Sequence, residues 1–270
     1  MTACSVILGC VMALLIILMS ISSIARYYIK FTFYVIISLC AATLPLPFMF
    51  LRPFDPKNAL VPAALLRMTA RLMGISWEVR GLENIDDSRG AVVLINHQSG
   101  LDLYVLAVLW PLMERCTVVA KRSLQYLVPF GTATWMWGTV FIDRGAVQAK
   151  NALNKQAEAI REHKRKLLVF PEGTRHDGEK LLPLRKGAFH VAVAAGAPVQ
   201  PVVVSKYHFL DSKRKRFGAG EIIITILPQM ETTDYKDNIA ELVEATQRTM
   251  QDTFTRTTAE TAARRRSKYD

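Results

Sequence analysis

Two long apolar stretches begin the chain. Residues 5–24 carry no charged side chain, and about 20 helical residues are long enough to span the roughly 30 Å of hydrocarbon in a bilayer. Arg26 and Lys30 interrupt the pattern before a second apolar stretch, residues 31–50. The pattern predicts an N-terminal hydrophobic helical membrane anchor, residues 1–56, with two hydrophobic segments.

The orientation of this anchor has more than one solution. A cleaved signal peptide is the less favoured interpretation, because no Lys or Arg precedes the apolar region and the run is long for one. A simple hairpin places Arg26 and Lys30 on the side opposite the catalytic domain, against the positive-inside tendency. A shallow hairpin, or a spanning helix followed by an interfacial one, avoids this conflict. The sequence leaves both open.

The next segment, residues 57–74, has apolar side chains at helical spacing that alternate with Arg67 and Arg71. This spacing predicts an amphipathic connecting helix. From residue 75 onward, strand patterns alternate with helical ones. The predicted strands are 77–81, 91–95, 117–120, 140–142, 167–170, 199–205 and 221–227, and the predicted helices are 101–112, 146–164, 187–195 and 237–256.

This alternation predicts an α/β domain over residues 75–257, with a mixed, largely parallel sheet flanked by helices. A basic tail, residues 258–270, follows. The formal net charge of +11 favours anionic partners. No RNA-binding signature, zinc-finger spacing or helix-turn-helix pattern favours nucleic acid. The four cysteines form no C-x-x-C pair, so neither a metal site nor a disulfide framework is expected.

The first segment with candidate chemistry is residues 91–102, where an apolar strand ends at His97 and a helix begins near Asp102. On an uninterrupted helix these side chains would lie about 140° apart. The intervening Ser99-Gly100 turn allows them to meet. Asp102 then accepts a hydrogen bond from one imidazole nitrogen and leaves the other as a base. The alternative is a structural histidine beside an acid that caps the helix.

The second segment, residues 138–145, is a short apolar strand that delivers Arg144 to a loop. The planar guanidinium of Arg144 suits a phosphate, and a surface ion pair with Asp143 is the alternative.

The third segment, residues 167–178, runs from a buried strand into Glu172-Gly173-Thr174-Arg175. Gly173 permits close backbone approach, and Thr174 and Arg175 supply a hydroxyl and a cation. Glu172 repels phosphate, so we expect it to orient Arg175 or to bind a substrate hydroxyl. An ordinary strand-to-turn exit is the alternative.

Together with the proline-bounded strand 196–205, these segments resemble the glycerolipid acyltransferase family, and within it the 1-acylglycerol-3-phosphate acyltransferases. The matching motifs are NHQSGLD (96–102), GTVFIDR (138–144) and FPEGTR (170–175); AKRSL (120–124) and RKGAFH (185–190) are also similar. The resemblance covers about residues 75–230. Gln200 departs from the apolar character of the fourth motif, which puts the shape of the acyl pocket in question. Core packing is the favoured interpretation of residues 202–204.

The resemblance implies acyl transfer from acyl-CoA to the sn-2 hydroxyl of lysophosphatidic acid, giving phosphatidic acid. It implies His97 as general base, oriented by Asp102, and acceptor phosphate or glycerol binding by the remaining motif side chains. These are Lys121, Arg144, Glu172, Gly173, Thr174 and Arg175. Acyl-CoA is expected as co-substrate, with no bound cofactor. The lipid bilayer is the other expected partner, and protein partners are not indicated.

The expected location is integral to a membrane, that of the endoplasmic reticulum in a eukaryote or the inner membrane in a bacterium. The Lys213–Arg216 run and the basic tail suit either attraction to anionic lipid or simple solvation. The nearest alternative function is acyl transfer to glycerol-3-phosphate or another lysophospholipid. A serine lipid hydrolase using Ser99 is disfavoured because the chain has no G-x-S-x-G elbow. A non-catalytic membrane scaffold is disfavoured by the intact motifs.

Overall fold

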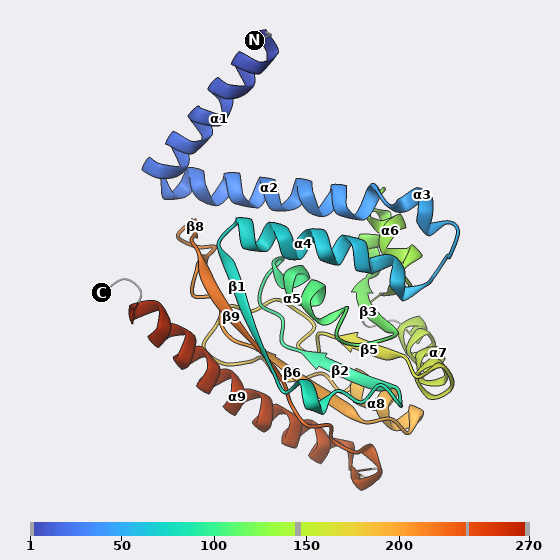
Figure 1. The fold of residues 1–270 in the computed structure, drawn as a ribbon. Helices are drawn as coiled ribbons and strands as arrows, with labels where there is room; N and C mark the ends of the chain where they lie inside the picture. The colour runs from blue at the N-terminus through green and yellow to red at the C-terminus, as the bar shows by residue number, and fades with distance from the viewer. Residues whose placement is uncertain (1–2, 144–146, 236–237, 268–270) are drawn as a thin grey trace.

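A seven-stranded sheet lies at the centre of the computed structural model, which describes residues 3–143, 147–235 and 238–267 (Figure 1). Its strand order is β1-β9-β6-β2-β5-β3-β4, and all neighbouring pairs are parallel except β6 and β9. The strands are β1 (Ile75–Arg80), β2 (Ala91–Ile95), β3 (Cys116–Lys121), β4 (Val140–Ile142), β5 (Lys166–Val169), β6 (Val199–Val204) and β9 (Gly220–Ile226). The prediction of a mixed, largely parallel sheet flanked by helices is confirmed.

Helices cover both faces of the sheet, because its central strands are apolar on both sides. In β2, Val93 and Ile95 pack in the cluster under α4 and α5, whereas Val92 and Leu94 pack in the cluster under α7, α8 and α9. The helices around the sheet are α4 (Leu60–Leu72), α5 (Asp102–Leu109), α6 (Phe130–Met136), α7 (Val147–His163), α8 (Gly187–Ala195) and α9 (Ile239–Ser267). The 3-10 turns are η1 (Pro56–Ala59), η2 (Leu82–Asn84), η3 (Arg122–Tyr126) and η4 (Thr232–Tyr235).

The apolar N-terminus forms two long helices, α1 (Ala3–Ile21) and α2 (Ser23–Thr43), followed by the short α3 (Leu46–Met49). Within the described ranges, two helical segments are long and apolar enough to cross a membrane, Cys4–Ile21 and Ser23–Met49. No residue of the first is buried, and α1 leaves the body at an angle (Figure 1). In contrast, α2 lies along the body and packs against α4, α6 and β8. One side of α2 therefore belongs to the core of the protein.

The predicted connecting helix is divided into η1 and α4. Its apolar face, which includes Ala63, Leu66 and Ala70, is buried against α5 and α2. Leu60, Met68 and Leu72 stay exposed on its outer side, so α4 is an integral layer of the fold.

The predicted end of the last helix, Arg256, is wrong, because α9 continues to Ser267 through part of the predicted tail. Thr258 and Thr261 are buried against the body. Arg264 pairs with Glu78 of β1 at 2.8 Å and with Glu221 of β9 at 2.9 Å. Two glutamates that lie far from Arg264 in the sequence therefore fix the last turn of α9. The run of basic residues in the sequence does not reveal these partners.

The sequence analysis also missed a small hairpin, β7 (Leu210–Asp211) with β8 (Arg216–Phe217). It forms a separate two-stranded sheet that packs on α2. The basic run Lys213–Arg216 forms its tip.

We expect Arg264→Ala to lower the free energy of unfolding by about 1 kcal/mol, because it removes a shared cation from a partly exposed ion-pair network that solvent screens. Denaturation of the full chain in neutral detergent measures the change. Arg266→Ala, an exposed arginine on the same helix, is the control and should leave the midpoint unchanged. Equal midpoints for the two variants would contradict a role of the Arg264 network in holding α9.

Candidate active site

The end of β2 and the start of α5 bring His97 and Asp102 together. Nδ1 of His97 lies 2.6 Å from Oδ2 of Asp102. The Ser99-Gly100 turn makes this possible by reversing the chain between the strand and the helix, as the sequence suggested. A carboxylate only accepts hydrogen bonds, so Nδ1 carries the ring proton and Nε2 presents its lone pair. The His97 ring also stacks on Phe170, with centroids 4.2 Å apart.

The Asp102 carboxylate is buried, with 5% of its side chain exposed, and its hydrogen bonds come from two parts of the chain. Oδ2 accepts the backbone N–H groups of Gln98 at 2.8 Å and Ser99 at 3.2 Å. Oδ1 accepts the hydroxyl of Tyr207 at 2.8 Å. Burial and the neighbouring Asp102 charge raise the pKa of Tyr207 well above its ordinary value, so it remains a donor. The carboxylate is therefore held on both oxygens.

The residues on either side of His97 are tied to the end of β6. The Asn96 side chain accepts the Val204 N–H at 2.7 Å and donates to the Val204 carbonyl at 3.0 Å. The Gln98 amide donates to the carbonyls of Val204 and Ser205. This double attachment fixes the backbone that presents the imidazole.

Glu172 bridges the backbone of His97 and Leu182. Its Oε1 accepts the backbone N–H of His97 at 2.7 Å, and its Oε2 accepts that of Leu182 at 2.9 Å. Burial raises the pKa of this carboxyl, whereas the two N–H donors act in the opposite direction. Glu172 is not among the residues that line the cavity, and its expected role toward Arg175 or a substrate hydroxyl stays a prediction.

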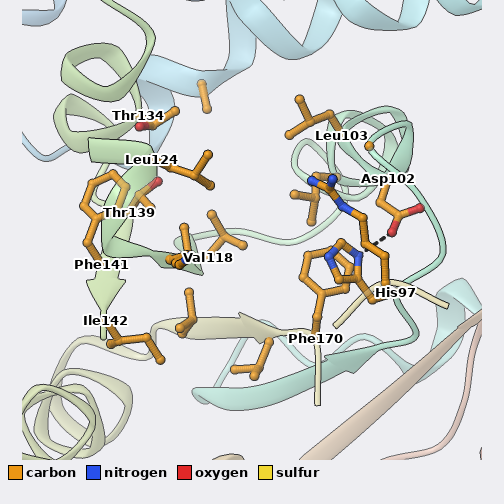
Figure 2. Close-up of a pocket in the computed structure, with 18 of the residues that line it drawn as sticks. His97, Asp102, Leu103, Val118, Leu124, Thr134, Thr139, Phe141, Ile142 and Phe170 are labelled. Carbon is orange, nitrogen blue, oxygen red and sulfur yellow. Dashed lines mark hydrogen bonds and ion pairs between the residues drawn. The ribbon is translucent and has the colours of Figure 1, made fainter. Parts of the chain in front are cut away.

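A cavity of about 680 Å³ opens beside His97 and Asp102 (Figure 2). His97, Asp102 and Phe170 lie at one end, and Thr134, Phe141 and Ile142 line the opposite wall. Small side chains on four elements make room for it: Ser38 and Ala42 on α2, Ala59 on η1, Ala63 on α4 and Ala107 on α5. The lining is mostly apolar. His97, Ser99 and Asp102 form a polar end, and the hydroxyls of Thr134 and Thr139 lie on the opposite wall.

Cations and backbone from the loop between β5 and α8 line the cavity, together with Lys121 at the end of β3. The residues of that loop are Gly173, Thr174, Arg175 and Arg185. Gly173 has φ +71°, and a Cβ there would lie 2.5 Å from Nε of Arg185. Arg185 therefore crosses over the glycine, so a larger residue there would displace the Arg185 side chain, and the positive φ disfavours any side chain at this position. The predicted phosphate ligand Arg144 lies outside the described residues.

Two further sequence interpretations are resolved. Asp143, from the second motif, pairs with Arg122 of η3 at 2.6 Å, which joins two of the family-like segments. Gln200 is buried in β6, where its amide donates to the carbonyl of Leu227 and accepts from Gln229. It is not among the residues that line the cavity, and β6 is buried along its whole length, in agreement with the favoured core interpretation of residues 202–204.

The sequence analysis missed Tyr207 and Arg185 as parts of the site. Arg185 belongs to RKGAFH, a segment already recognised as similar to the family, so its motif was a usable signal. Tyr207 had no such signal, because its partner Asp102 lies 105 positions away.

Comparisons with known proteins agree with this geometry. The family model described as Acyltransferase matches residues 76–205. The chain is 35% identical over 233 residues to 1-acyl-sn-glycerol-3-phosphate acyltransferase alpha of Bos taurus, covering 85% of this chain and 80% of that protein. It is 36% identical over 210 residues to the Homo sapiens protein of the same name, covering 77% and 74%.

A solved structure shares the fold. It is the crystal structure of the 1-acyl-sn-glycerophosphate (LPA) acyltransferase PlsC from Thermotoga maritima, with a TM-score of 0.66 at 20% identity. The match covers 85% of this chain and 96% of that one.

We expect Glu172→Gln to lower the free energy of unfolding by about 1–3 kcal/mol, because an amide cannot accept both backbone N–H groups and leaves one buried donor unpaired. Asp177→Asn is the matched control, an exposed carboxylate in the same loop. Chemical denaturation of both variants in neutral detergent measures the difference. A Glu172→Gln variant as stable as wild type would contradict the bridging role.

Proposed function

The chain belongs to the 1-acyl-sn-glycerol-3-phosphate acyltransferase family, and we propose that it transfers a fatty acyl group from acyl-CoA to the sn-2 hydroxyl of lysophosphatidic acid. The product is phosphatidic acid. The observation that carries the proposal is the His97–Asp102 pair at the mouth of an apolar cavity whose polar end carries arginines.

The proposed reaction needs one general base and no covalent enzyme intermediate, because the thioester of acyl-CoA is already activated. Nε2 of His97 takes the proton of the acceptor hydroxyl as its oxygen attacks the acyl carbon. The C–S bond then breaks, and the departing thiolate of CoA takes the proton from the imidazolium. Asp102 holds the ring orientation and stabilises the imidazolium while it exists.

Different parts of the cavity suit the acyl chain and the phosphate of the acceptor. Its apolar wall, which includes Leu124, Phe141 and Ile142, suits an acyl chain, whose burial removes apolar surface from water. Its volume of about 680 Å³ lies within the range of ligand sites. Arg175 and Arg185 lie at the polar end, where guanidinium groups suit the phosphate of the acceptor. Lys121 is a further candidate cation there.

We place this enzyme at a membrane, because the acceptor lipid and the product lipid both enter the bilayer. The exposed apolar surface of α1 supports a retained anchor. The packing of α2 along the body favours one inserted helix followed by an interfacial one, since a spanning α2 would draw α4 and α6 into the hydrocarbon.

The rival functions differ in acceptor or in chemistry. The Ser99 hydroxyl accepts the Leu101 N–H within the turn, and among the described residues it makes no hydrogen bond to His97 that would activate it as the nucleophile of a hydrolase. A panel of radiolabelled acyl-CoAs against lysophosphatidic acid, glycerol-3-phosphate and lysophosphatidylcholine tests the acceptor. Preferred transfer to either of the last two would replace the proposed substrate.

We expect His97→Ala to reduce acyl transfer to lysophosphatidic acid by a factor of about 10²–10⁴, the usual effect of losing a general base. Initial rates in membranes, at matched protein abundance, measure it. The control is His190→Ala, an exposed histidine on α8, which should retain the wild-type rate. Full activity in the His97 variant would refute the mechanism.

We expect Arg175→Ala to raise the acceptor KM about tenfold or more, because a charge-assisted hydrogen bond to phosphate is lost. The KM for acyl-CoA should stay unchanged. Lys180→Ala removes an exposed cation from the same loop and serves as the control. An unchanged acceptor KM would refute the assignment, and a raised acyl-CoA KM would reassign Arg175 to the donor.

A further inference from the structure

The β7–β8 hairpin carries four consecutive cations that the proposed reaction does not use. They are Lys213, Arg214, Lys215 and Arg216, and all but Lys215 are exposed. Asp211, the last residue of β7, lies opposite Arg216, and its carboxylate accepts the Arg214 N–H at 2.8 Å and lies 3.9 Å from Nε of Arg214. The four cations outnumber this one acid. The tip therefore presents a concentrated positive charge to its surroundings.

The hairpin is fixed to the first half of α2 by an apolar contact. Phe217 is 2% exposed, and its ring centroid lies 5.2 Å from that of Phe31. Nζ of Lys30 lies 5.0 Å from the centre of the Phe217 ring and donates to the carbonyl of Gly218 at 3.1 Å. Nζ of Lys215 lies 5.3 Å from the centre of the Tyr27 ring. These contacts hold the hairpin against the first half of α2.

This position is next to the junction of α1 and α2 (Figure 1). Nε of Arg26 donates to the carbonyl of Met19 at 2.7 Å, which ties the two helices together at the bend. The side chains of α1 are apolar and exposed, as expected for a helix surrounded by hydrocarbon. If α1 enters a bilayer from this end, the junction lies at the depth of the headgroups. Tyr28, 53% exposed at the junction, is a residue type enriched at that depth.

We propose that the tip of the β7–β8 hairpin binds the phosphate groups of anionic lipids at the surface of the bilayer that α1 enters. The inference rests on the membrane location given in the proposed function. Charge complementarity supports this partner, because each Lys or Arg close to an anionic membrane surface strengthens binding about fivefold. Since the base of the hairpin is fixed to α2, this contact also sets how the body lies on the membrane.

The test measures lipid selectivity of the full chain after reconstitution into phosphatidylcholine vesicles. Trace spin-labelled phosphatidylglycerol is compared with trace spin-labelled phosphatidylcholine for association with the protein. We expect wild type to prefer the anionic label, and the triple variant Lys213→Gln, Arg214→Gln, Arg216→Gln to lose at least about threefold of that preference. High salt should reduce the wild-type preference in the same direction.

The matched control removes the same number of charges elsewhere. Arg161→Gln, Lys164→Gln and Arg248→Gln alter exposed cations at the end of α7 and on α9. The lipid selectivity of this triple control variant should equal that of wild type. Equal selectivity of wild type and the tip variant would overturn the proposal. An equal loss in the tip variant and the control would also overturn it, because net charge would then be the cause.

Acyl transfer in neutral detergent micelles separates this proposal from the proposed function. The tip variant should retain the wild-type rate there, because the hairpin contacts no substrate. Lack of acyl transfer by wild type would refute the proposed reaction but leave the hairpin result standing. Normal acyl transfer with no hairpin-dependent selectivity would refute only the hairpin.

Discussion

The buried carboxylate of Asp102 is the constraint on which the candidate site depends. A charged group removed from water needs donors, and four are supplied: the His97 ring, the Gln98 and Ser99 backbone, and the Tyr207 hydroxyl. Opening the turn between β2 and α5 would leave the Asp102 carboxylate without these donors. The loss in free energy would be well above that of one ordinary hydrogen bond. One side chain thus fixes the end of β2, the start of α5 and the loop after β6.

The parallel sheet explains why the other motif lies next to this turn. β2 and β5 are adjacent and parallel, so the loops at their carboxyl ends meet at one edge of the sheet. Glu172 accepts the His97 N–H, and the His176 N–H donates to the His97 carbonyl at 2.9 Å. Residues about 75 positions apart are thereby held as one unit. His97 and the EGTR segment with Arg175 are close because their strands are neighbours.

The local features of this structure could be predicted from the sequence, and the partners of polar side chains could not. Alternating apolar patterns gave strands such as β2 and helices such as α8 at their observed bounds, because periodicity depends only on neighbouring residues. The turn between His97 and Asp102 was also local. The bridge that Glu172 makes was not predicted, because its partners are backbone N–H groups, which have no sequence signature. The same reason hid Tyr207, whose hydroxyl reaches Asp102 only after the sheet has formed.

The end of α9 and the place of Gln200 show a second limit. Threonines form the buried stripe of α9, and their polar character conceals the helical period that leucines would reveal. Gln200 departs from the family pattern, yet its buried amide is satisfied by the Leu227 carbonyl and Gln229. A polar residue in a strand can therefore be a core residue when the next loop supplies its partners.

The helix α2 joins the anchor to the site, so the N-terminal segment is more than a tether. The Tyr34 hydroxyl donates to the Gly100 carbonyl at 2.5 Å, in the turn that brings His97 to Asp102. Ser38 and Ala42 on the same side line the cavity, whereas Phe33 and Ile36 are exposed on the other. One helix is thus a wall of the cavity and, in the proposed function, the surface that meets lipid. In the proposed function, the small side chains of α2 leave space for the acyl chain and its outer side chains meet lipid, so the residues that serve these two purposes occupy opposite faces and can vary independently.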